Sequence, residues 1–180
     1  MIQVRRNVFE TNSSSTHSIC IVTDDRAETI YPSKFIFKCG QFGWEFRNYN
    51  DPVSKGQYFY TGLCELYGKE KTREVMRDIE QYFKTEHNID VFVDEPDYRK
   101  STYNGKEYEY IDSDCGYIDH VTDAQDLIDA LVQDKELLID FLFKDASFVA
   151  TGNDNAYEEE RMTMEVPPYG LEYKEFYKGN

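Results

Sequence analysis

A run of eight polar residues near the start of the sequence, Thr11 to Ser18, contains the side chains best suited to chemistry. Ser13, Ser14 and Ser15 stand just before His17, and a serine beside an imidazole becomes a nucleophile when a carboxylate orients the ring. The same hydroxyl and amide groups can bind an anion. The simpler interpretation is a hydroxyl-rich turn whose side chains bond to their own backbone.

A second polar cluster, residues 114–120 (DCGYIDH), places an aspartate next to a histidine. Asp119 and His120 offer a metal ligand, a general base, or a carboxylate that orients another histidine. The simpler interpretation is a solvated acidic turn. A third cluster, residues 151–155 (TGNDN), follows a predicted strand and contains Asp154. Strand ends often hold ligand-binding groups, although Asn and Asp there are also ordinary turn residues.

If the three loops converge, they bring two imidazoles and two carboxylates together: His17, Asp119, His120 and Asp154. Such a set is sufficient for a divalent metal or for acid–base catalysis, with the serines positioning an anionic substrate. This pattern supports one hypothesis, a metal-dependent or His/Ser-based hydrolase acting on a nucleotide or another anionic substrate. No cofactor other than that metal is expected.

The acidic residues of the chain are unevenly distributed. Its 180 residues include 20 Lys and Arg against 35 Asp and Glu, a formal net charge of −15. Residues 1–85 sum to +1, whereas residues 86–180 hold eight basic and 24 acidic side chains, a net of −16. Nine carboxylates and no Lys or Arg lie between Glu107 and Asp134. Direct binding to nucleic acid is not expected, because neutralising phosphates requires a basic surface.

The acidic stretch supports a competing hypothesis, in which ordered carboxylates occupy a basic surface of another protein. Carboxylates on rigid elements can imitate a phosphate backbone and enter a groove that binds nucleic acid. Interleaved tyrosines suit an interface as well. The simpler interpretation is a solvated face that maintains solubility. The candidate binding residues are Glu107, Tyr108, Glu109, Tyr110, Asp112, Asp114, Tyr117, Asp119, Asp123, Asp126 and Asp129.

Alternation of apolar and polar residues predicts strands at residues 2–8 and 18–23, with residues 11–17 connecting them. Residues 35–37 and 44–46 flank two glycines and predict a hairpin. The apolar spacing over residues 70–86 predicts a helix, and residues 52–66 predict a shorter helix before it.

Residues 91–93 predict a strand, and Asn104-Gly105 predicts a tight hairpin turn. Thr122 with Gln125 predicts a capping box for one helix, and Asp134 predicts the cap of the next. A strand over residues 147–151 follows. We expect a single α+β domain over residues 1–180, with a mixed or antiparallel sheet and about three helices. Residues 166–180 are expected to form an edge strand or a loosely held tail.

The start of the sequence has no apolar stretch long enough for a signal peptide, and no segment is long enough to span a bilayer. The four cysteines form no CxxC pair and are expected to be reduced, mostly buried thiols. These features predict a cytoplasmic protein without membrane partners, whose oligomeric state stays open.

Three segments together resemble a group of small uncharacterised proteins of bacteriophages and mobile elements of Gram-positive bacteria. They are VRRNVFETNSSSTHSI at 4–19, GYIDH at 116–120 and FVATGNDN at 148–155. No activity is associated with that group, so the resemblance implies no catalytic role. It implies a setting: a phage product in the host cytoplasm that acts on a host or defence component. With the acidic stretch, it favours an accessory protein that inhibits by binding, for example in the nucleic-acid channel of a CRISPR-type nuclease.

Overall fold

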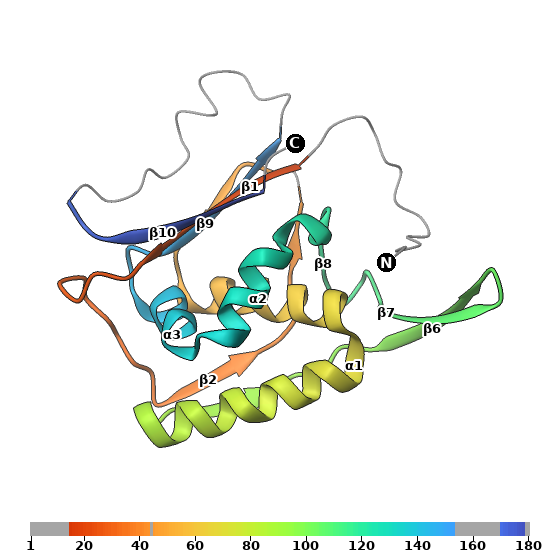
Figure 1. The fold of residues 1–180 in the computed structure, drawn as a ribbon, viewed down its shortest axis with the longest axis horizontal. Coiled ribbons are helices and arrows are strands. Elements are labelled where there is room, and N and C mark those ends of the chain that lie inside the picture. Colours follow the sequence, from red (N-terminus) through yellow and green to blue (C-terminus); the bar gives the residue numbers. More distant parts are fainter. Residues whose placement is uncertain (1–14, 44, 154–169, 179–180) are drawn as a thin grey trace.

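The structure is a computed structural model that describes residues 15–43, 45–153 and 170–178. It confirms the α+β class: three α-helices pack with short, mostly antiparallel strand pairings in this part of the chain. Figure 1 shows a sheet across one side of the molecule and the helices below it. The strand predicted at residues 2–8 lies outside the described residues.

A four-stranded antiparallel sheet joins segments from both halves of the chain. Its order is β10 (Tyr173–Lys178), β1 (Ser15–Val22), β9 (Phe148–Asn153) and β4 (Arg47–Tyr49). β10 therefore occupies an edge of the sheet. The prediction of a connecting loop up to residue 17 is wrong for residues 15–17, because β1 starts at Ser15 and pairs with β9 from its first residue.

Helix α1 (Pro52–His87) turns sharply once, and Figure 1 shows its second half running back beneath its first half. Asp51 caps its start, accepting a hydrogen bond from the Ser54 amide at 2.9 Å. Gly68 interrupts the helix with φ 72° and ψ 177°, a backbone conformation that favours glycine. The two predicted helices are thus both confirmed, and they join end to end at this kink.

Two shorter helices follow in the second half of the chain, α2 (Gln125–Gln133) and α3 (Lys135–Phe143). The predicted cap of α3 is confirmed, since Asp134 accepts a hydrogen bond from the Leu137 amide at 3.0 Å. The predicted capping box at Thr122 is wrong. A 3-10 turn, η1 (Val121–Ala124), precedes α2, and no side chain caps that helix.

Three two-stranded pairs complete the described fold. β2 (Lys34–Phe37) pairs in parallel with β5 (Asp90–Val93), and β3 (Gln41–Phe42) pairs in parallel with β8 (Tyr117–Ile118). The hairpin predicted between residues 35–37 and 44–46 is therefore wrong, because residues 35–37 pair with β5. Residues 45 and 46 belong to no strand, and residue 44 lies outside the described residues.

The third pair is a hairpin of β6 (Tyr98–Tyr103) and β7 (Lys106–Ile111), which extends away from the helices in Figure 1. Its turn is confirmed. Asn104 and Gly105 both have positive φ, 49° and 73°, as a type I′ turn requires.

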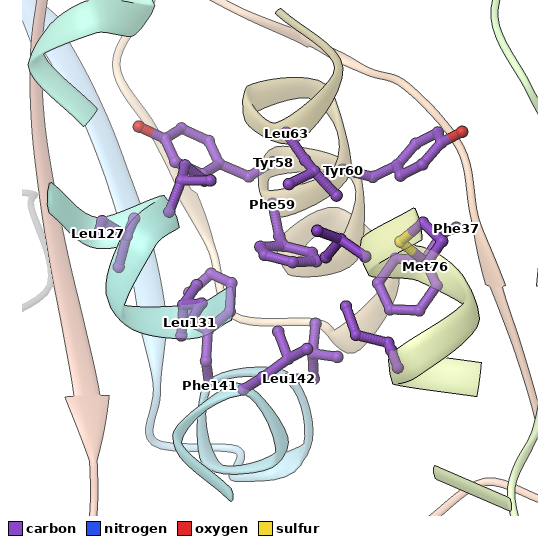
Figure 2. Close-up of a cluster of buried hydrophobic side chains, with 14 of the residues drawn as sticks. Phe37, Tyr58, Phe59, Tyr60, Leu63, Met76, Leu127, Leu131, Phe141 and Leu142 are labelled. Carbon is purple, nitrogen blue, oxygen red and sulfur yellow. The ribbon is translucent and has the colours of Figure 1, made fainter. Parts of the chain in front are cut away.

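The core is rich in aromatic rings. Figure 2 shows Tyr58, Phe59 and Tyr60 of α1 pointing in different directions into side chains of α2 and α3 and into Phe37. All four rings are at most 1% exposed. Rings replace aliphatic side chains here because the chain is lean in Leu, Ile and Val, and each aromatic residue buries a large apolar area.

A lysine is also fully buried beside this core. The Lys55 ammonium, 0% exposed, donates to the carbonyls of Lys144 and Ser147 at 2.8 and 2.9 Å. These contacts tie the first turn of α1 to the segment between α3 and β9.

The cysteines are free thiols, with Cys20 and Cys64 buried and Cys39 and Cys115 partly buried. Within the described residues, none of the helices has an apolar stretch long enough to cross a membrane.

Candidate functional site

The pairing of β1 with β9 brings the first and third polar clusters together. Ser15 lies opposite Asn153 and His17 lies opposite Thr151 in the antiparallel register. Segments more than 130 residues apart in the sequence therefore lie side by side, where the first residues of β1 meet the last residues of β9. Ser13, Ser14 and Asp154 belong to these clusters but lie outside the described residues.

The second cluster approaches the same place through β3. The Asp119 amide donates to the Phe42 carbonyl at 2.8 Å, and the next residue, Gly43, contacts His17 through its own carbonyl, which is 3.2 Å from Nε2. The described parts of all three clusters thus meet around Gly43. We call His17, Gly43, Thr151 and Asp119 the polar junction.

His17 is held at the junction by two hydrogen bonds and is 0% exposed. The Gly43 carbonyl can only accept, so Nε2 donates to it and bears a hydrogen. Nδ1 lies 2.9 Å from the Tyr58 hydroxyl. Burial, with a smaller contribution from Glu65, raises the pKa of Tyr58 far above its ordinary value, so the phenol stays protonated and donates to Nδ1. The imidazole thereby links β1, β3 and α1.

Two residues of α1 that the sequence patterns do not single out support the junction. Tyr58 bonds His17, and Glu65, two helical turns later, accepts the Ile118 amide at 2.9 Å. Both face the same way because seven residues span two turns of a helix. The spacing is visible in the sequence, but it indicates a site only once the partner strands are known.

Asp119 and His120 lie on the outer side of the junction. Their side chains are 20% and 46% exposed, and His120 Nε2 stands 3.9 Å from Asp119 Oδ1. His120 has a left-handed backbone, with φ 51°, at the point where β8 passes into η1. This pair is accessible to a ligand, whereas His17 and Ser15 are buried. Within the described residues, no three His, Cys, Asp or Glu side chains are grouped so as to hold a metal ion.

The hairpin places its acidic residues among cations. Lys100 Nζ lies 3.1 Å from Glu107 Oε2, and Lys100 is the register partner of Glu109. At the base of the hairpin, Arg99 forms an ion pair with Asp112. Residues 98–111 contain three basic and two acidic side chains, so the hairpin is not an acidic surface.

The two candidate tyrosines of the hairpin, Tyr108 and Tyr110, lie on its other face. Strand alternation puts Glu107 and Glu109 on one side and Tyr108 and Tyr110 on the opposite side. Tyr108 is half-buried and Tyr110 is exposed. Tyr117, the remaining candidate tyrosine, is partly buried in β8, with its ring close to Gly43.

The carboxylates beyond the hairpin fall into two groups. Asp129 accepts a hydrogen bond from the Tyr67 hydroxyl, and Asp134 caps α3, so both hold the fold together. Asp114, Asp123 and Asp126 are exposed, and none of them forms an ion pair with a Lys or Arg in the part of the chain that the structure describes. We call Asp114, Asp119, Asp123 and Asp126 the acidic ridge.

Comparisons with protein-family models, with curated proteins and with solved structures find no match.

Proposed function

We propose that this protein acts by binding, with the acidic ridge occupying a basic surface of another protein. The observation that supports the proposal is the exposure of Asp114, Asp123 and Asp126 without an ion-pair partner among the described Lys and Arg residues. Carboxylates that lack a cation among the described residues keep their charge available for a partner. The field of such a group also steers a basic partner during association.

The ridge stands on backbone that is fixed to the core. Ile118, Val121 and Leu127 are at most 2% exposed, and they anchor β8, η1 and α2 respectively. Hydrogen bonds from the backbone of residues 118 and 119 to Glu65 and Phe42 add to this. Rigid placement favours binding because little conformational entropy is lost when the partner docks.

The partner that fits this chemistry is a protein groove lined by Lys and Arg. A groove that binds nucleic acid has this character, and carboxylates at fixed positions compete there with phosphates. The resemblance to phage proteins favours a host or defence nuclease as the owner of the groove, and the proposed role is then inhibition. Partners would be bound in the host cytoplasm.

A matched pair of charge reversals tests the proposal. Asp123→Lys with Asp126→Lys changes two ridge residues, and Glu107→Lys with Glu109→Lys changes net charge equally on the hairpin. In pull-downs from host lysate at low salt, we expect a basic protein to be retained by the parent and by the hairpin variant. The ridge variant should retain at least about tenfold less, and added salt should release the partner from the parent. Equal retention by both variants would contradict the proposal.

A second candidate function, hydrolysis of an anionic substrate, is favoured by the meeting of the polar clusters at the junction. His120→Ala is the informative variant because the side chain is exposed and its removal leaves the core intact. Release of phosphate from nucleotides, measured with and without added divalent metal, would support this function if the parent is active and His120→Ala is not. Activity that is unchanged in His120→Ala would exclude a role for the Asp119–His120 pair.

A further inference from the structure

The parallel pair of β2 and β5 presents an apolar face to solvent. Ile36 and Phe92 are neighbours in the register and are 56% and 50% exposed. Their alternate neighbours Phe35, Phe37 and Val91 point into the core. Parallel strands are normally covered on both faces, so an open face on such a pair indicates a surface that another element covers.

The charges around this face follow a regular pattern. β2 and the residue after it contribute Lys34, Ile36 and Lys38, whereas β5 and the residue after it contribute Asp90, Phe92 and Asp94. Lys34 is the register partner of Asp90, which also forms an ion pair with Lys84 of α1 at 2.7 Å. The Asp94 amide donates to the Phe37 carbonyl at 2.8 Å, which continues the pairing and sets Lys38 beside Asp94. One strand is therefore basic, the other is acidic, and an apolar pair lies between the charged pairs.

We propose that this face is the contact surface of a weak symmetric dimer, and that its occupant is a second copy of this chain. When two such faces meet about a two-fold axis parallel to the strands, β2 of one copy lies over β5 of the other. Lys34 then faces Asp90 of the second copy, Ile36 faces Phe92, and Lys38 faces Asp94. A two-fold contact is self-complementary, as symmetric dimers require.

The charge pattern selects this arrangement over its alternative. A two-fold axis across the strands would set β2 over β2 and bring Lys34 against Lys38, and Asp90 against Asp94. The two strands contribute two Lys and two Asp, and Lys84 of α1 adds one positive charge beside Asp90, in a chain of net charge −15. Two copies repel through most of their surface, so an apolar face without excess negative charge is where they can approach. Because the face is small, the dimer is weak and depends on concentration.

Sedimentation of the full chain at about 0.15 M salt, where like net charges are screened beyond about 8 Å, tests the dimer. Between about 10 µM and 0.5 mM, a range in which weak complexes dissociate, we expect the mean mass to rise from 21.2 kDa toward twice that value. Ile36→Thr with Phe92→Thr keeps the strand propensity and removes the apolar contact. It should raise the concentration for half-dimerisation about tenfold or more. A mass that stays at 21.2 kDa throughout would overturn the proposal.

Two charge variants test the pairing itself. Lys34→Asp with Lys38→Asp makes the face acidic, and Asp90→Lys with Asp94→Lys makes it basic. Each variant alone should be monomeric, and an equimolar mixture should form a heterodimer more tightly than the parent dimerises. Lys100→Asp with Lys106→Asp on the hairpin is the control and should dimerise as the parent does. Circular dichroism verifies that each variant is folded. Failure of the two folded variants to associate, or dimers of either variant alone, would overturn the arrangement.

Discussion

The hairpin of β6 and β7 and the acidic ridge are adjacent in the sequence and both bear carboxylates, yet they differ in charge. Glu107 on the hairpin lies 3.1 Å from Lys100, because the antiparallel register makes residues 100 and 107 diagonal neighbours on one face. Asp123 and Asp126 on η1 and α2 have no such cation among the described residues. Counting charges along the chain treats the two regions alike. Strand pairing determines which carboxylates remain available.

The two regions also differ in their attachment to the core. β8 and α2 bury Ile118 and Leu127 in the core, whereas the hairpin is anchored at its base by Ile111 and Tyr98 and is mostly exposed beyond it. The surface proposed for binding is thus the rigid one. The hairpin is held mainly by its own turn and by cross-strand pairs.

The largest expected effect is a difference in stability between a variant of β8 and a variant of the hairpin. Ile118→Ala should lower the free energy of unfolding by about 3 kcal/mol, because it leaves a cavity in the core. Tyr108→Ala on the hairpin should cost under about 1 kcal/mol, the scale of a single cross-strand pair. Urea unfolding followed by circular dichroism measures both. Similar losses in the two variants would show that the hairpin is as integral to the fold as β8.

The next prediction separates a carboxylate that stabilises the fold from one that is exposed, both within the acidic stretch from Glu107 to Asp134. Asp134→Ala should lower the free energy of unfolding by about 1 kcal/mol, because α3 loses the cap that bonds the Leu137 amide. Asp126→Ala, in the same segment, should change it by less than about 0.5 kcal/mol. If both variants lose stability equally, the separation of structural from available carboxylates is wrong.

The N-terminal cap of α1, Asp51, predicts how the stability of the fold depends on pH. Burial raises the pKa of Asp51, but hydrogen bonds from the Ser54 side chain and amide outweigh it, and the pKa lies below its ordinary value. The ionised carboxylate therefore stabilises the folded state above about pH 4, and this contribution is lost as the pH falls through the lowered pKa. Asp51→Ala should be about 1 kcal/mol less stable than the parent at pH 7. The difference in the free energy of unfolding between Asp51→Ala and the parent should become smaller in acid. In Asp51→Asn, the loss of stability should come from the missing charge alone.

The smallest expected effect has opposite signs in the two regions. Asp123→Asn with Asp126→Asn removes like charges three residues apart and should raise the free energy of unfolding by a few tenths of a kcal/mol at low salt. Glu107→Gln should lower it by a similar amount, because it breaks an exposed ion pair. Thermal unfolding at low and high salt measures both shifts. They should shrink together as salt rises, and shifts of the same sign would contradict the contrast between the regions.

Sequence patterns predict the elements whose causes are local. The second half of α1, the Asn104-Gly105 turn and the Asp134 cap each depend on residues within a few positions, and all three are confirmed. The α+β class follows from the same local signals. The Thr122 capping box is wrong because η1 occupies the turn before α2.

Long-range pairings are the part that the sequence does not reveal. Residues 35–37 pair with residues 91–93 across more than 50 positions, and a local pattern cannot indicate a partner so distant. The junction depends on the same kind of information. That His17 faces Thr151 follows from the β1–β9 register, and its burial follows from Tyr58 of α1. The serine and histidine pattern is present in the sequence, but its geometry depends on three distant elements.

The buried ammonium of Lys55 allows unfolding to be detected with a chemical reagent. An amine-reactive acylating agent attacks a free, solvated amine, and this one is 0% exposed and donates to two carbonyls. Exposed lysines such as Lys71 and Lys100 should be acylated within the folded protein. Lys55 should be acylated only in molecules that have opened, so the extent of its labelling in a digest reports the unfolded fraction directly, even inside a crowded lysate.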